Sequence, residues 1–454
     1  MCRKKGRVVL VGDVGLNLNR ADFYVKEIDF LISTSYGPGR YDQRYEEQGL
    51  DYPIGYVCWT ENRKMAEYLR LIAAGCVQIA PMVAARYPIS AAEAAYAAIS
   101  GSEKPLVILL TYPGQAAPRG RLVTLTAAPR TNTGQIRIAV VGAGSFARSA
   151  HLPNLRALSE HFSLRAVVNR TGHTAKAVGQ QFGADYVSTD TKEVFADSKV
   201  DAVLIATRHH LHGSLVLAAL RAGKHVLVEK PLTLSMSELQ ALEDFYKAEV
   251  GTTKPLLLTG YNRRFSPHAL RLKTIVANRA APFIFNYRMN AGYIHSEHWV
   301  HGTEGGGRNL GEACHIYDVF TFLADAEVVA VSAHAIKSTT AHYGRNDNFV
   351  ATVSFADGSV ATLTYTALGH KNYPKETAEL YVDGKVAVLD DYKTLTVHGA
   401  NHQSLKTRPQ DKGLMAELQS FAAGIQSGEW PIPLWQQVQV SRLAFIVEEQ
   451  IHRA

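Results

Sequence analysis

Three short motifs in this sequence carry residues whose types and spacing suit redox chemistry on a small molecule. The first is GAGSFA at residues 142–147, which follows the apolar run IRIAVV and precedes a helical pattern. In such a loop one glycine makes a tight turn, the next lets the backbone approach a pyrophosphate, and a small third residue lets the helix pack on the strand. The free N–H groups of the helix start bind phosphate oxygens. We therefore predict a dinucleotide site, rather than a purely structural turn, at Gly142, Gly144, Ser145, Phe146 and Ala147.

The end of the next predicted strand bears on which dinucleotide is bound. NAD sites usually place Asp or Glu there to bind the ribose 2′-hydroxyl, whereas a nearby Arg accommodates the 2′-phosphate of NADP. This chain has Asn169 followed by Arg170. A neutral Asn beside Arg170 removes the repulsion that a carboxylate would create. The expected cofactor is NAD(P), with a slight preference for NADP and with contacts from both residues.

The second motif, VLVEKP, places Glu229 and Lys230 at the carboxyl end of another predicted strand. Ligands of open α/β sheets bind outside that edge. An ammonium group held there can lose its proton when it is desolvated, and it can then act as an acid or base. On spacing alone, an ordinary surface lysine after a strand explains the pattern equally well.

Five motifs in order resemble the glucose–fructose oxidoreductase/inositol dehydrogenase (Gfo/Idh/MocA) family. They are GAGSFA, ATRHHLH at 206–212, HVLVEKP at 225–231, GYNRRFSP at 260–267 and GGGRNLGEACHIYD at 305–318. The resemblance covers residues 136–454. It implies a Rossmann domain followed by an α/β domain with an open sheet. It also implies an NAD(P)-dependent enzyme that oxidises or reduces a carbinol of a sugar, inositol or nucleotide sugar.

The resemblance also implies roles for individual residues. Lys230 matches the family's catalytic lysine, and His315 matches the histidine of its last motif. Where the family usually has Asp, four residues before this histidine, the chain has Gly311 followed by Glu312. Either Glu312 substitutes for that carboxylate, or Lys230 and His315 act without it. Further contacts are implied with the cofactor at Thr207, His209, His212 and Glu229, and with the substrate at Arg263, Glu312, Asp318 and Tyr293.

The first 112 residues resemble a different dehydrogenase. GRVVLVGDVG at 6–15, STSYGPGRYD at 33–42 and PISAAEAAYAAI with PLVILLTYP are similar to the last part of a zinc-type, medium-chain alcohol dehydrogenase. The zinc-binding domain of such a protein would lie before Met1. We therefore expect this segment to bind no zinc and to carry no catalysis, and to cover the main domain or to dimerise.

The elements that must position these motifs predict an α/β protein. Strands and helices alternate from residue 136, which indicates a doubly wound parallel sheet. After about residue 259, strand-like alternation of apolar and polar residues occurs at 283–291, 327–336, 348–355, 359–367 and 377–390, with short turns between, which favours a mainly antiparallel sheet. The expected organisation is a truncated alcohol-dehydrogenase-like segment at 1–112, a linker at 113–135, within which LVTLT at 122–126 could be a short strand, a Rossmann domain at 136–258 and a substrate domain at 259–454.

Composition restricts the partners. The 454 residues are 46% apolar and 20% charged with a net charge of +7, which is ordinary globular usage. Basic residues form no block of the kind that tracks nucleic acid, and no apolar run is long enough to cross a membrane. Four scattered cysteines fit a reducing, cytoplasmic location, and we expect no metal site, even at His295, His298 and His301. We expect a homo-oligomer; a degenerate nucleotide-binding scaffold or sensor is the alternative function.

Overall fold

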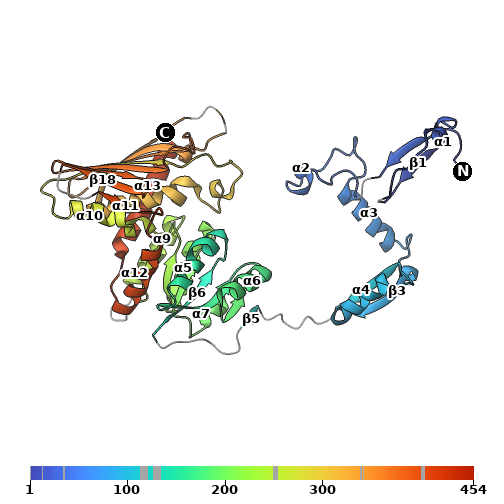
Figure 1. Ribbon diagram of the computed structural model, residues 1–454, viewed down its shortest axis with the longest axis horizontal. Helices are drawn as coiled ribbons and strands as arrows, with labels where there is room; N and C mark the ends of the chain where they lie inside the picture. Colours follow the sequence, from blue (N-terminus) through green and yellow to red (C-terminus); the bar gives the residue numbers. More distant parts are fainter. Residues whose placement is uncertain are drawn as a thin grey trace. The chain divides into compact units, whose positions relative to one another are not determined.

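The computed structural model describes residues 2–12, 14–33, 36–112, 121–125, 134–248, 254–337, 340, 342–399 and 404–453. The chain divides into two compact units, Met1–Arg119 and Gly120–Ala454 (Figure 1). Among the described residues, no helix is long and apolar enough to cross a membrane.

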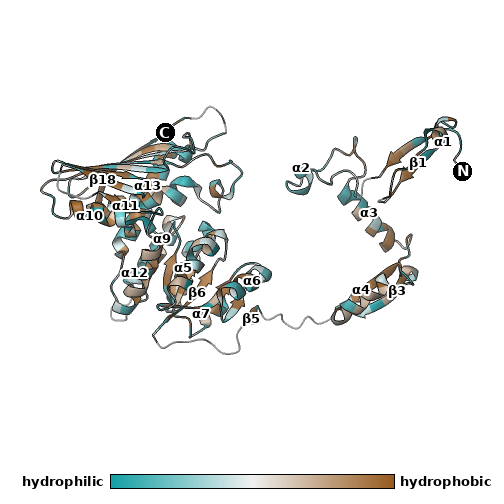
Figure 2. Ribbon diagram, in the orientation of Figure 1, coloured by the Kyte–Doolittle hydropathy of each residue, from teal (hydrophilic) through white to brown (hydrophobic). Residues whose placement is uncertain are grey.

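The unit Met1–Arg119 holds two separate pairs of parallel strands, β1 with β2 and β3 with β4. Its elements are β1 (Arg7–Leu10), α1 (Arg20–Tyr24), β2 (Asp29–Ile32), α2 (Gln43–Glu46), α3 (Glu61–Ala73), β3 (Val83–Pro88), α4 (Ala92–Ser100) and β4 (Val107–Thr111). Helix α3 spans the helical pattern of the sequence, yet Met65 and Leu69 on its apolar face are 55% and 66% exposed. Among its described residues, Ala95 is the only buried apolar side chain. Figure 2 shows apolar residues along α3, α4 and β3.

The second unit contains the predicted Rossmann sheet. Its strand order is β11-β10-β9-β6-β7-β8-β5, and every pair except β5–β8 is parallel. The strands are β5 (Leu122–Thr124), β6 (Ile136–Val141), β7 (Phe162–Val168), β8 (Tyr186–Ser188), β9 (Ala202–Ile205), β10 (His225–Val228) and β11 (Leu257–Thr259). Chain order reverses on either side of β6, so β6, β7 and β9 form the switch point where such sheets bind ligands.

Helices join these strands as parallel connections require. They are α5 (Leu152–Ala157), α6 (Gly172–Phe182), α7 (Thr191–Ala196), α8 (His212–Arg221) and α9 (Met236–Lys247). Strands β6 and β9 are buried almost throughout, which explains their apolar sequences, interrupted only by the half-buried Arg137 of β6.

The remainder of this unit is built on an eight-stranded, mainly antiparallel sheet in the order β13-β14-β15-β12-β16-β17-β18-β19. Its strands are β12 (Ile284–Asn290), β13 (Val328–Ala335), β14 (Asn348–Phe355), β15 (Val360–Thr366), β16 (Glu376–Val382), β17 (Lys385–Asp390), β18 (Thr394–His398) and β19 (Leu405–Lys406). The helices are α10 (Pro267–Val276), α11 (Cys314–Ala324), α12 (Leu414–Ser427) and α13 (Leu434–Arg453). Figure 1 shows α10 and α11 on one side of the sheet. The expected fold class is confirmed.

One local expectation needs correction, and one alternative that the sequence left open is found. The run 377–390, expected as one strand, is a hairpin of β16 and β17 because Asp383 and Gly384 turn with φ of 46° and 71°. Positive φ at both central residues is what a tight type I′ hairpin turn requires. Within the expected linker, Leu122–Thr124 forms β5 and pairs with β8 at the sheet edge. Residues 113–120 and 126–133 of that linker lie outside the described residues.

Candidate active site

The glycine loop after β6 has the geometry that a dinucleotide needs. Gly142 has a φ of +93°, and a Cβ there would lie 2.6 Å from the carbonyl oxygen of Ala206, so only glycine fits. A Cβ at Gly144 would meet nothing within 4 Å, which leaves open space beside the backbone. The helical turn η3 (Ala147–His151) follows directly. A tight turn, free space and a helix start together fit a bound pyrophosphate.

The loop after β9 connects the glycine turn to Lys230. Thr207 follows Ala206, and its carbonyl oxygen lies 3.3 Å from His212 Nε2. The other ring nitrogen, Nδ1, lies 2.7 Å from the carbonyl oxygen of Pro231. His212 is fully buried, and this burial lowers its pKa. A neutral imidazole has a single N–H and can donate to only one of these carbonyls, the closer being that of Pro231, so it ties the residue after Lys230 to the start of α8.

The side chain of Lys230 lines a cavity of about 230 Å³ at the carboxyl end of β10. Its Nζ donates to the carbonyl oxygen of Gly311 at 2.8 Å. The lining residues of the cavity come from both the part with the Rossmann sheet and the part with the eight-stranded sheet. It is lined by His209, Lys230, Arg263, Ile294, Trp299, Val300, Gly307, Arg308, Gly311, Glu312 and His315.

Two histidines on the cavity wall are held in the neutral form. Burial and the nearby Lys230 ammonium lower the pKa of His209 to about 3. Its Nδ1–H donates to the carbonyl oxygen of Gly305 at 2.7 Å. Burial, followed by the charge of Arg263, lowers the pKa of His315 well below its usual range. A neutral imidazole offers one donor and one acceptor, so His315 can hold a substrate hydroxyl in place.

Glu312 does not take the place of the carboxylate that Gly311 omits. Its two oxygens accept from Arg308 at 2.9 Å and from Lys375 at 2.7 Å, and the Tyr365 hydroxyl also donates to it. Burial alone would raise the pKa of Glu312, but these two cations hold it far below its usual range. Lys230 is therefore not among the hydrogen-bond partners of Glu312 in this structure.

Glu229 has a buried partner that the sequence analysis did not single out. His151 Nε2 donates to its Oε1 at 2.7 Å, and the His151 side chain is fully buried. Burial opposes the ionised form, but the hydrogen bond from His151 gives Glu229 a net lowered pKa. The GAGSFA signal stops four residues before His151, so sequence spacing alone offered no reason to pair these two side chains.

Arg263 and Asp318 are each committed to an ion pair. Arg263 lines the cavity and binds Glu376 through two hydrogen bonds of 2.7 and 2.9 Å. Asp318 binds Arg264 in the same two-pronged manner and is fully buried, outside the cavity wall. Asp318 therefore holds the segment after β11 against α11, and Arg263 faces the cavity with its charge partly compensated.

The other expected contacts lie further out. Tyr293 is 41% exposed and stacks on His342 at 4.3 Å between ring centroids, while its neighbour Ile294 lines the cavity. The Asn169 side chain donates to Thr171 Oγ1 at 3.3 Å, and Arg170 is exposed.

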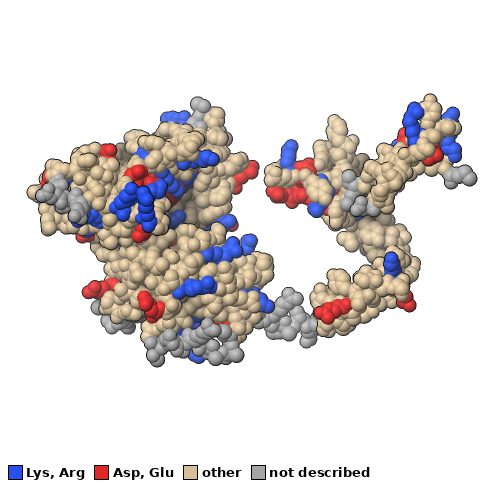
Figure 3. Space-filling view, in the orientation of Figure 1, with Lys and Arg blue, Asp and Glu red and all other residues tan. Residues whose placement is uncertain are grey.

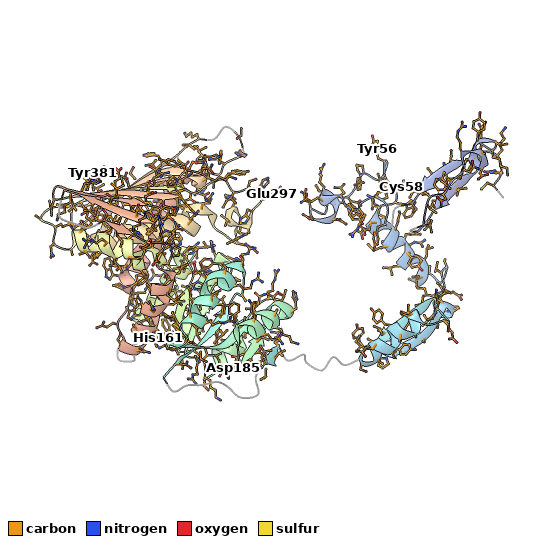
Figure 4. The ribbon with its side chains drawn as sticks, in the orientation of Figure 1. Tyr56, Cys58, His161, Asp185, Glu297 and Tyr381 are labelled. Atoms are coloured by element: carbon orange, nitrogen blue, oxygen red, sulfur yellow. The ribbon has the colours of Figure 1, made fainter. Side chains whose placement is uncertain are left out.

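The histidine-rich segment that follows β12 projects from the second unit. Figure 4 shows Glu297 at the outer end of this segment. Among the described residues, no three His, Cys, Asp or Glu side chains are grouped so that they could hold a metal ion. Trp299 of this segment does reach the cavity, where it packs edge-on against His209 at 4.9 Å and under Arg208 at 3.9 Å.

Comparisons with known proteins agree with this geometry. Residues 136–251 match the oxidoreductase family with an NAD-binding Rossmann fold, and residues 276–390 match the GFO/IDH/MocA C-terminal domain. A scyllo-inositol 2-dehydrogenase (NAD(+)) of Bacillus subtilis is 26% identical over 310 residues, which is 66% of this chain and 88% of that protein.

Solved structures share the fold. UDP-N-acetylglucosamine 3-dehydrogenase of Acidithiobacillus ferrooxidans has a TM-score of 0.60 at 22% identity, over 70% of this chain and 98% of that one. Levoglucosan dehydrogenase, solved with NADH and levoglucosan, has a TM-score of 0.59 at 20% identity over the same shares. The two domain models follow the order in which the chain forms its two large sheets, and together they match just over half of its residues. The chain therefore belongs to the GFO/IDH/MocA family of oxidoreductases, with an NAD-binding Rossmann domain.

Proposed function

We propose that this protein is an NAD(P)-dependent dehydrogenase acting on a carbinol of a sugar or sugar-like compound. The observation that carries the proposal is the position of Lys230. Its side chain reaches a cavity at the carboxyl end of β10, together with His315, and His212 ties the following Pro231 beside Thr207 in the loop after β9. Reacting groups of a doubly wound fold gather at this edge.

The proposed reaction removes a hydride and a proton from the carbinol in one direction and returns both in the other. A bound nicotinamide supplies the hydride acceptor or, in the reverse direction, the donor. In the oxidative direction the electron pair of the carbinol C–H bond would leave as hydride, and the hydroxyl proton would pass to Lys230 Nζ once this group has given up its own proton and become a neutral amine, so that a ketone forms. His315, in its neutral form, holds the reacting hydroxyl. Glu229 and His151, buried behind the lysine, fix the strand end that carries it.

The experiment for this proposal is a substrate panel followed at 340 nm. Purified protein is mixed with NAD or NADP and with inositols, hexoses, hexuronates, hexose phosphates and nucleotide sugars. We expect an absorbance increase that requires both cofactor and one class of carbinol. Cofactor binding without turnover across the whole panel would contradict the proposal and favour a degenerate nucleotide-binding scaffold.

We further infer a slight preference for NADP from the residues after β7. Arg170 is exposed beside a neutral Asn169, so a 2′-phosphate meets a cation and no carboxylate. We expect NADPH to bind at least as tightly as NADH in a fluorescence titration. Arg170→Ala should weaken NADPH about tenfold, the size of one lost charge-assisted contact, and leave NADH within twofold. Arg221→Ala, an exposed arginine at the end of α8, is the control, and tenfold tighter NADH in the unaltered protein would overturn the preference.

For residues 1–112 we propose an auxiliary role without zinc or catalysis, as the remnant of a medium-chain alcohol dehydrogenase. The support is the lack of a buried core. Among the described residues of this segment the apolar side chains are largely exposed, and the strands form only two-stranded pairs. The boundaries near residues 112, 135 and 258, the cytoplasmic location and the homo-oligomeric state are proposed on the sequence arguments alone.

A further inference from the structure

The cavity wall carries a carboxylate that is outnumbered by cations. Glu312 accepts from both Arg308 and Lys375, at 2.9 and 2.7 Å. Arg308 is 2% exposed and also donates to the carbonyl oxygen of Gly292 at 2.6 Å, so its position is fixed. Lys375 is more open, with 43% of its side chain exposed. One carboxylate and two cations leave this group with a net charge of about +1 at neutral pH.

The same arrangement occurs a second time around Glu376. Arg263 binds it with two hydrogen bonds, and Lys412 binds it at 2.6 Å. The Tyr287 hydroxyl donates to it at 2.6 Å without changing the charge. Burial would raise the pKa of Glu376, but Arg263 and Lys412 lower it to about 2, so the carboxylate is ionised. This group also keeps about one unit of positive charge, because two cations again face one anion.

Lys230 adds a third positive charge that the protein leaves uncompensated. Its hydrogen bond goes to the carbonyl of Gly311, and no carboxylate of the described chain is paired with it. A side chain at position 311 would not fit in this arrangement, because a Cβ would lie 2.8 Å from His209 Cε1. The packing therefore excludes a carboxylate at this position.

The remaining acidic groups nearby do not cancel this charge in the wall. Glu229 bonds to His151, Asp318 bonds to Arg264, and neither carboxylate lines the cavity. Even when Glu229 is counted as an unpaired anion, the surroundings of the cavity stay positive by about two charges. Figure 3 shows Lys and Arg side chains gathered on the visible face of this unit, over the part that carries the large sheet.

His315 responds to this positive field. After burial, the contributions that lower its pKa come from four cations, which are Arg263, Lys230, Lys412 and Lys375. A like charge within a few ångströms disfavours a second positive charge. Burial disfavours any charge, but the contribution of the four cations should by the same physics favour an anion over a neutral group.

We propose that the substrate of this site is a monosaccharide that carries its own negative charge, as a carboxylate or a phosphate. This inference rests on the proposed dehydrogenase function. The volume of about 230 Å³ is below the range of about 300–1,000 Å³ typical of drug-sized ligands, so it suits one sugar ring rather than a whole nucleotide sugar. The anionic group meets Arg308 and Arg263, the cations of these two groups that line the cavity, and the reacting hydroxyl meets Lys230 and His315.

The test compares matched acidic and neutral sugars as probes. Binding to the protein loaded with NADH is measured by titration calorimetry for glucose, galactose and mannose, for the corresponding hexuronates and for the hexose 6-phosphates. We expect at least one hexuronate or hexose phosphate to bind ten times more tightly than its neutral parent, and the advantage to shrink as salt is added. The separate acid and phosphate arms identify which anion is preferred.

Two variants and one control locate the effect. Lys375→Gln and Lys412→Gln each remove one cation from a group of three, and each should reduce the anion advantage about tenfold, as for one charged contact. Binding of the neutral sugar should stay within threefold. Lys385→Gln makes the same charge change at the far end of β17, next to the residue that pairs with Tyr381, which Figure 4 shows at the outer end of the sheet. This control should behave as the unaltered protein.

The possible outcomes distinguish the anionic substrate from the proposed dehydrogenase function on which it rests. Equal or tighter binding of every neutral sugar, or no binding of any acid or phosphate in the panel, overturns the anionic substrate. Turnover of neutral sugars alone would do so while leaving the dehydrogenase function intact. If acids bind tightly but no compound of the panel is turned over at 340 nm, the proposed dehydrogenase function fails and the anion site remains.

Discussion

Replacing Lys230 with methionine is expected to reduce the turnover rate about a thousandfold or more, within the range that general acid–base catalysis contributes. Methionine keeps much of the aliphatic length of lysine but has no proton to give or accept. The ammonium makes one hydrogen bond, to the Gly311 carbonyl, so its loss should not disturb the fold. The dissociation constant of the cofactor should stay within about threefold. Steady-state kinetics at 340 nm and fluorescence titration of the cofactor measure the two effects.

A second variant at the same position distinguishes proton transfer from simple positive charge. Lys230→Arg keeps a cation in the cavity, but a guanidinium does not lose its proton under working conditions. If Lys230 moves the hydroxyl proton, the arginine variant should be nearly as inactive as the methionine variant. Lys247→Met, at the exposed end of α9, is the control for the substitution itself. An arginine variant with more than a tenth of the original rate would show that charge alone is sufficient and would refute the acid–base role.

The parts of the fold that the sequence predicts are those set by local patterns. The buried strands β6 and β9 are apolar runs, interrupted in β6 only by Arg137, and the GAGSFA turn has a glycine at the position where φ is +93°. The hairpin at 383–384 was missed because alternation continues across Asp383-Gly384 and only the turn residues mark the break. Strand β5 was open as an alternative within the linker, because three residues of β pattern gain stability only through pairing, here with β8.

The candidate site was predictable in its residue types but not in its partnerships. Lys230 and His315 come from recognisable motifs, and the structure brings them to one cavity. Arg263 is paired with Glu376, which lies 113 residues away on β16. Glu312 could be weighed from sequence as a substitute carboxylate only because its partner Lys375, 63 residues away, was unknown. Such pairs depend on how the two sheets pack, and no local spacing contains that information.

Glu417 is a buried acid whose protonation should make the stability of this protein depend on pH. It lies in the first turn of α12, is fully buried, and neither of its oxygens finds a hydrogen-bond partner within the described chain. Burial, together with the nearby charges of Glu229 and Asp318, raises its pKa well above its usual range. The folded protein therefore holds a proton on Glu417 at a pH where the unfolded chain, with a pKa of about 4.3, has lost it.

This difference gives the sign and size of the effect of Glu417→Gln. Between the unfolded and folded pKa values the folded state binds one more proton, so stability falls by about 1.4 kcal/mol for each unit of rising pH. Glutamine resembles the protonated acid and cannot ionise, so the variant should match the unaltered protein near pH 4.5 and gain a stability advantage that grows as the pH rises toward the folded pKa of Glu417.

Urea unfolding between pH 4.5 and 8, followed by circular dichroism, measures this effect as the difference between the two proteins at each pH. Glu429→Gln, an exposed glutamate just beyond the end of α12, is the matched control and should show no such trend. A constant difference between Glu417→Gln and the unaltered protein across this range would mean that Glu417 is ionised in the folded state.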